Sequence, residues 1–102
     1  MGEGSGQRRK IYGLTSQIRR AAASVPANIA EGYGRESTGA YVQFLKTARG
    51  SLRELETHLL LAARLEMLEG KQAIALITDA ESIGKMLHAL LPTLQMKKPA
   101  VR

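Results

Sequence analysis

The 102-residue sequence lacks cysteine and tryptophan and contains a single phenylalanine. Without cysteine it can form neither a disulfide scaffold nor a thiolate metal site, and the absence is compatible with the cytosol. No run of about 18 apolar residues occurs, so the sequence predicts no transmembrane helix. The first ten residues carry charge without a following apolar run, which argues against a secretory signal. The expected location is therefore the cytoplasm, with no membrane partner.

The sequence is rich in alanine, leucine and basic residues, in a length that fits one small domain. High alanine and leucine content with few aromatic residues predicts helices. The net charge is +6 and it is unevenly spread. Residues 1–53 contain nine Lys or Arg and three acidic residues, whereas residues 54–102 contain six of each. This asymmetry predicts a basic face, for which RNA or DNA is the obvious acidic partner.

The first predicted helix begins at Leu14 or Thr15, after a Gly-rich segment 1–10 that we expect to be disordered and basic. Pro26 lies inside this helix and predicts a kink or break over residues 22–25. Gly32 and Gly34 are expected to end it, since glycine tolerates the left-handed conformation after a helix. The helix carries a one-sided apolar stripe, namely Leu14, Ile18, Ala22, Val25 and Ile29.

The second predicted helix is capped by Ser37 or Thr38 and runs to about Met67 or Leu68. Gly50 in its middle suggests a close contact with another helix, because glycine there costs about 1 kcal/mol relative to alanine. Phe44 and Leu60 are expected to widen its apolar face. That face is a heptad seam with alternating spacings of four and three: Tyr41, Leu45, Ala48, Leu52, Leu55, Leu59 and Ala62.

The third predicted helix follows a short turn at residues 69–70 and is expected to kink or end at Pro92. Beyond it, residues 97–102 form a basic tail that we expect to fray. Leu76, Ile83 and Leu90 flank its apolar seam. The seam has the same alternating spacing and consists of Ala73, Ile77, Ala80, Gly84, Leu87, Leu91 and Leu94.

Together these elements predict an all-α, antiparallel up-down helix bundle over residues 11–96. The two long heptad helices form a hairpin, and the first helix packs against it. Three helices with wide apolar faces are too few for a closed core. We therefore expect an oligomer, or a fourth helix from elsewhere, to complete the bundle.

No residue pattern indicates catalysis, a cofactor or a metal. His58 lies one helical turn after Glu54, which favours a surface ion pair or hydrogen bond, and His88 is expected at the edge of the core. Residues 32–35 contain two glycines but lack the P-loop pattern and a preceding strand. The sequence therefore predicts a protein that is not an enzyme.

The candidate nucleic-acid-binding residues are basic side chains of the first two helices. Lys46, Arg49 and Arg53 are spaced by three and four residues and flank the apolar seam, where they could bind phosphates. The alternative is that they pair with glutamates across helices or subunits. Few aromatic residues are available for stacking, so binding should be electrostatic rather than sequence-specific. The full candidate set is Arg19, Arg20, Arg35, Lys46, Arg49 and Arg53.

Asn28 and Glu31 lie three residues apart on one face of the first helix. Asn28 could satisfy a backbone group that Pro26 leaves without a partner, or Glu31 could pair with an arginine from a neighbour. Either role would be structural.

Three stretches resemble the four-helix-bundle family named after proteins encoded in bacterial 23S ribosomal RNA intervening sequences. They are YGLTSQIRRAAASVPANIAEGYGR (12–35), YVQFLKTARGSLRELETHLLL (41–61) and, more weakly, AARLEML (62–68). The resemblance implies an up-down helix bundle that assembles as a homopentamer. Related accessory proteins of diversity-generating retroelements act beside a reverse transcriptase, where their basic barrel is thought to bind nucleic acid and the polymerase.

The sequence departs from this family before residue 11, where members usually carry an amphipathic helix. Here that region is MGEGSGQRRK, which is short and polar. A mis-assigned start, a truncated gene or a true three-helix variant would each explain the difference. An exposed apolar groove is then expected, which favours association.

The sequence and the resemblance together predict a non-catalytic, oligomeric helix-bundle protein that binds nucleic acid electrostatically as an accessory factor. One alternative is a protein–protein scaffold that docks an acidic partner or a reverse transcriptase. Another is a truncated remnant, which would unfold with weak cooperativity.

Overall fold

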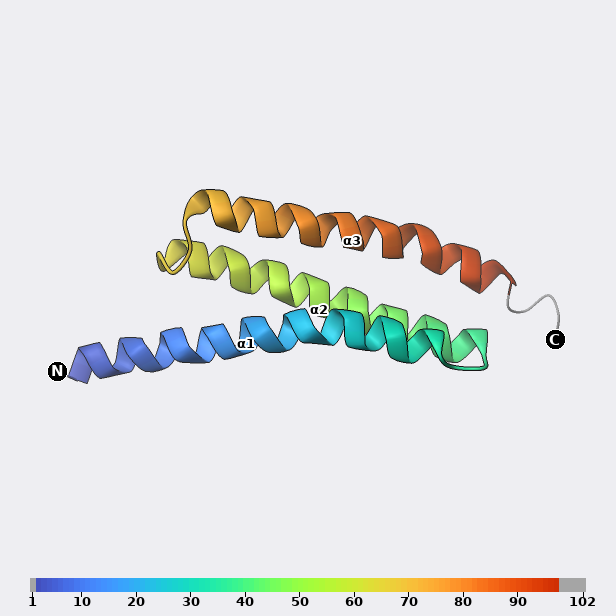
Figure 1. Ribbon diagram of the computed structural model, residues 1–102, viewed down its shortest axis with the longest axis horizontal. Coiled ribbons are helices and arrows are strands. Elements are labelled where there is room, and N and C mark those ends of the chain that lie inside the picture. Colours follow the sequence, from blue (N-terminus) through green and yellow to red (C-terminus); the bar gives the residue numbers. More distant parts are fainter. Residues whose placement is uncertain (1, 98–102) are drawn as a thin grey trace.

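The computed structural model describes the backbone of residues 2–97 and the side chains of residues 13–96, and it places three helices there without any strand. α1 (Gly2–Tyr33), α2 (Thr38–Arg64) and α3 (Gly70–Lys97) run up, down and up. α2 packs against both neighbours, whereas the described parts of α1 and α3 share no close backbone contact (Figure 1). The predicted all-α antiparallel arrangement is confirmed.

α1 begins earlier than the sequence indicated and continues through Pro26. Residues 2–10, expected to be disordered, continue the same helix, because extending an existing helix avoids the cost of nucleation. Of the predicted kink or break at Pro26, the break does not occur, since the helix continues to Tyr33. Ala21 and Val25 are buried on α2 at 3% and 5% exposure, and this packing holds the helix together around the proline.

The end of α1 at Tyr33 confirms the predicted stop, but the role of glycine there differs from the expected one. No described glycine has a positive φ. A Cβ at Gly32 would instead lie 2.7 Å from the Cβ of Phe44 and 3.0 Å from Cδ1 of Tyr41. Gly32 therefore lets the end of α1 approach the start of α2 closely.

α2 begins as predicted, because the Ser37 hydroxyl accepts a hydrogen bond from the backbone N–H of Ala40 at 3.1 Å. It ends at Arg64, earlier than predicted. Glu66 has a φ of 60°, and the N–H groups of Glu66 and Met67 close the last turn on the carbonyls of residues 63 and 62. The buried residues of α2 are Val42, Leu45, Ala48, Leu52, Leu59 and Ala62.

Two expectations for α2 fail. Leu60 is 55% exposed and does not widen the core. A Cβ at Gly50 would meet nothing within 4 Å, so no close contact within the described chain explains this glycine.

α3 packs on α2 through Ala73, Ala80, Leu87 and Leu91. Of the predicted kink or end at Pro92, the end does not occur, because α3 continues to Lys97. Pro92 removes the donor for the carbonyl of residue 88, and both residues are exposed, so water can take the donor's place. Of the predicted basic tail, Lys97 ends the helix and residues 98–102 lie outside the described residues.

The core runs along α2, with Leu45 and Leu52 as its most deeply buried large side chains. Between α1 and α3 it stays open, as the sequence predicted. We call this hollow of about 260 Å³ the apolar groove. It is lined by Ile18, Ala22, Val25, Pro26, Leu52, Leu55, Leu59, Leu76, Asp79, Ala80 and Ile83.

Candidate nucleic-acid interface

Arg49 and Arg53 line a second open hollow, of about 460 Å³, between α2 and α3. They follow the buried Ala48 and Leu52 in sequence, which turns them toward the flank of α2 along which α3 passes. We call this hollow the basic groove. Its lining residues are Arg49, Leu52, Arg53, Glu56, Glu81, Gly84, Lys85 and His88.

Lys85 and His88 were not among the predicted site residues. Their spacing of three places them on one side of α3, next to the seam residues Gly84 and Leu87. That pattern was visible in the sequence, but only the packing of α3 on α2 brings these residues to the arginines. His88, expected at the core edge, is exposed.

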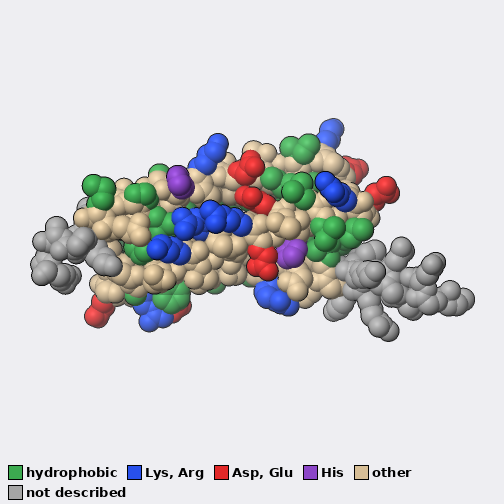
Figure 2. Space-filling model, turned by 180° about the vertical axis from the view of Figure 1, so that it is seen from behind, with side chains coloured by type: hydrophobic (Ala, Val, Ile, Leu, Met, Phe, Trp, Pro, Cys, Tyr) green, Lys and Arg blue, Asp and Glu red, His purple; other side chains and the backbone are tan. Residues whose placement is uncertain are grey.

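The basic groove has mixed charge. Figure 2 shows Lys and Arg side chains gathered near the middle of the molecule, with acidic side chains beside them. Glu56 and Glu81 line the groove, yet within the described residues no ion pair joins them to Arg49, Arg53 or Lys85. Within the described residues, these arginines therefore do not pair with glutamates across helices, and pairing across subunits stays the alternative.

The other predicted residues do not join this groove. Arg35 donates to the carboxylate of Glu31 at 2.7 Å and lies 4.9 Å above the ring centroid of Phe44, so it closes the α1–α2 corner. Glu31, for which an arginine from a neighbour was one of the expected partners, therefore pairs with an arginine of its own chain. Lys46 is exposed on α2, three residues before Arg49.

The two predicted site arginines of α1, Arg19 and Arg20, lie apart from the basic groove. Arg20 donates to the side-chain oxygen of Gln17 at 3.5 Å. Arg19 lines a smaller hollow near Ile18, on the side of the apolar groove. The predicted set therefore separates into an α2 stripe of Lys46, Arg49 and Arg53, and three scattered arginines.

Asn28 has a structural role, but a different one from that expected. Its amide donates to the backbone carbonyl of Ser24 at 2.8 Å and to the Ser24 hydroxyl at 2.9 Å. The carbonyl that Pro26 leaves without its usual donor belongs to Ala22, so Asn28 does not compensate for the proline. The Ser24 hydroxyl also shares a 2.8 Å hydrogen bond with the Ser51 hydroxyl, which ties α1 to α2.

The described residues contain no group of acidic or histidine side chains able to hold a metal ion. The Nε2 of His58 lies 3.7 Å from the carboxylate of Glu54, so the predicted pair is adjacent, but both ring nitrogens of His58 are buried without a hydrogen bond. Tyr33 is 78% exposed and meets Tyr41 edge-on at a ring-centroid distance of 6.1 Å.

Among the described helices, none is both long and apolar enough to cross a membrane.

Comparison with known proteins agrees with this fold. A crystal structure of a protein with unknown function from the S23 ribosomal protein family of Bacteroides thetaiotaomicron has a TM-score of 0.75 and 28% sequence identity. The match covers 76% of this chain and 72% of that chain. No curated protein matches the sequence significantly. The family model described as 23S rRNA-intervening sequence protein matches residues 4–89, which reach into all three helices. The chain therefore belongs to the 23S rRNA-intervening sequence protein family.

Proposed function

We propose that this protein is a non-catalytic helix-bundle protein that binds nucleic acid at the basic groove through phosphate contacts. The observation that carries the proposal is that Arg49, Arg53 and Lys85 line one open groove from two helices without an ion pair within the described chain. Arginine side chains offer planar donors that suit phosphate oxygens, and lysine adds a point charge. Binding would release counterions from the nucleic acid.

The groove supports electrostatic rather than sequence-specific binding. Its lining contains no aromatic side chain on which bases could stack. Glu56 and Glu81 lie beside the cations and would lower the affinity for phosphate. Repetition of the groove in a homo-oligomer, the pentamer of the resemblance, would raise the overall affinity through multivalency.

The test is fluorescence anisotropy of a labelled, unstructured RNA titrated with protein between about 50 and 200 mM salt. We expect the logarithm of the affinity to fall linearly with the logarithm of the salt concentration. The double variant Arg49→Gln/Arg53→Gln should bind at least about tenfold more weakly, and two lost contacts should reduce the salt slope by about 1.4. Glu81→Gln should bind more tightly.

The matched control is Arg64→Gln/Lys71→Gln, which removes the same charge at exposed positions far along the bundle from the groove. It should retain most of the affinity, and circular dichroism should show equal helicity for all variants. Equal weakening by both double variants would mean that net charge, not the groove, drives binding. No binding at the lowest salt would contradict the proposal and favour a scaffold that docks an acidic protein.

A further inference from the structure

The two walls of the basic groove carry their titratable side chains in matching order. These are Arg49, Arg53 and Glu56 on α2, and His88, Lys85 and Glu81 on α3. Each set is spaced by three and four residues and forms a stripe along one side of its helix. Because α2 and α3 run antiparallel (Figure 1), Arg49 and His88 lie toward one end of the groove. Glu56 and Glu81 lie toward the other end, so His88 shares the cationic end.

The cationic end of the groove favours an anion that can reach both walls. Arg49 and Arg53 of α2 and Lys85 of α3 form no ion pair within the described residues. Like charges that line one hollow repel each other, and an anion placed between them removes this repulsion. A phosphate backbone carries several such charges in a row, so it can contact side chains of both helices at once.

The His88 ring is available to such an anion. His88 is exposed, and no hydrogen bond or ion pair within the described residues engages its ring. A neutral imidazole has one N–H donor, whereas a protonated one has two and carries a positive charge. Histidine is the side chain that ordinarily changes charge between pH 5 and 8. The number of cations at this end of the groove therefore depends on pH.

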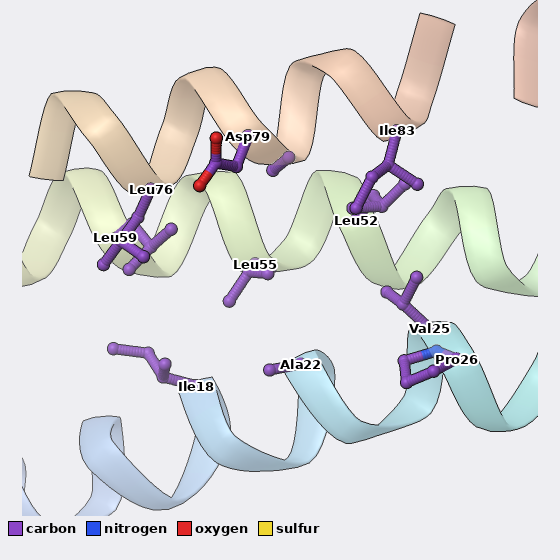
Figure 3. A pocket seen from close by; sticks show the side chains of 11 residues that line it. Ile18, Ala22, Val25, Pro26, Leu52, Leu55, Leu59, Leu76, Asp79 and Ile83 are labelled. Atoms are coloured by element: carbon purple, nitrogen blue, oxygen red, sulfur yellow. The ribbon is translucent and has the colours of Figure 1, made fainter. Parts of the chain in front are cut away.

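The other acidic and histidine side chains nearby do not share this role. Figure 3 shows Asp79 among the apolar side chains of the apolar groove, and it does not line the basic groove. His58 lies beside Glu54 and is also absent from the lining. Carboxyl groups such as those of Glu56 and Glu81 titrate mainly below about pH 5. A change in binding at higher pH therefore points to His88.

We propose that protonated His88 is a fourth phosphate-binding side chain of the basic groove, so that nucleic-acid binding strengthens as the pH falls from about 7.5 to about 5.5. This inference rests on the proposed function. The ring takes one proton from solvent and donates an N–H to a phosphate oxygen, and no covalent bond of the nucleic acid changes. A bound phosphate favours the charged ring, so binding and protonation reinforce each other. Each wall then supplies two phosphate-binding residues.

The experiment is fluorescence anisotropy of an oligouridine without terminal phosphates, titrated with protein at about pH 5.5 and about pH 7.5 and at constant ionic strength. The RNA has no group that titrates in this range, and the dye is chosen to be insensitive to pH. We expect the wild-type chain to bind about twofold to fivefold more tightly at the lower pH. One additional contact to a single strand should also steepen the salt slope by about 0.7.

Three variants separate His88 from the rest of the chain, with equal helicity checked by circular dichroism. His88→Asn should bind equally at both pH values, and His88→Lys should bind at the higher pH about as tightly as wild type does at the lower. His58→Gln is the matched control and should keep the wild-type pH dependence.

Two kinds of failure can be told apart. Binding that does not change with pH in wild type, or that still strengthens at low pH in His88→Asn, would overturn the role of His88 and leave the proposed function standing. No binding at either pH would contradict the proposed function and this inference together.

Discussion

At the scale of single residues, two glycines that both lie inside helices have opposite environments. Gly32 is buried where α1 meets the start of α2, and an added Cβ would lie 2.7 Å from that of Phe44. Gly50 is exposed and a Cβ there would meet nothing within 4 Å. Helical position alone therefore says nothing about whether a glycine is required.

We predict that Gly32→Ala lowers the free energy of unfolding by about 1–2 kcal/mol. A Cβ–Cβ contact of 2.7 Å cannot be relieved by turning a side chain, so the helices must shift apart, and such overpacking costs about 1–3 kcal/mol. This cost outweighs the higher helix propensity of alanine. Urea denaturation monitored by circular dichroism measures the change.

Gly50→Ala is the control, and it should raise the free energy of unfolding by about 1 kcal/mol through helix propensity alone. Equal effects of the two substitutions would contradict the close approach of α1 and α2 at Gly32.

The arginines likewise differ in the residues that surround their charge. Arg35 and Arg49 look equivalent in the sequence, yet Arg35 is engaged by Glu31 and Phe44, whereas Arg49 lines an open groove beside α3. Only the neighbours supplied by other segments decide which arginine is available to a phosphate.

At the scale of helices, α1 and α2 are joined by a polar contact as well as by apolar packing. The hydroxyls of Ser24 and Ser51 lie 2.8 Å apart, and Asn28 supports Ser24 from the next turn of α1. Such a contact between partly buried groups fixes the relative position of two helices, because misalignment leaves hydroxyls without partners.

We predict a coupling energy of about 0.5–1.5 kcal/mol between Ser24→Ala and Ser51→Ala in a double-mutant cycle. Thermal or urea unfolding of the two single variants and the double variant measures it. Ser82→Ala, at an exposed position on α3, should change stability by less than about 0.5 kcal/mol. Additive single effects would show that the serine contact does not form.

The helices themselves were largely predictable, but the start of α1 and the ends of α2 and α3 were not. Alternating spacings of three and four placed α2 and α3, and five of the seven residues in the predicted α2 seam are fully buried. Neither proline ends its helix, because the packing of Val25 and Leu91 on α2 outweighs the loss of one hydrogen bond at each. Sequence rules that consider only neighbouring residues do not include the free energy of that packing.

At the scale of the whole molecule, the decisive feature is that α1 and α3 both pack on α2 but not on each other. One side of the three-helix layer is therefore an apolar groove, and the basic groove lies on the other flank of α3. The two grooves share Leu52 alone among their lining residues, so they are separate surfaces.

We predict that the melting temperature of the wild-type chain rises by a few degrees for each tenfold rise in protein concentration. Mass action stabilises a folded oligomer relative to unfolded monomers, and for a chain of this length about 1 kcal/mol corresponds to about 4–8 °C. Differential scanning fluorimetry over a hundredfold range of concentration measures the shift. A constant wild-type value would argue against an oligomer.

The sequence by itself determined the fold class, the course of α2 and α3, the family and the location of excess charge in the first half. The fold class, the helices and the charge follow from apolar periodicity and composition, which are local properties of the chain, whereas the family follows from the resemblance of three stretches. The tertiary structure decided that α1 continues through Pro26 and that Gly32 permits a close helix contact. It also decided that Lys85 and His88 of α3 meet Arg49 and Arg53 of α2. The physical reason is that burial, steric contact and charge pairing arise between segments distant in sequence, so their energies exist only once the helices are packed.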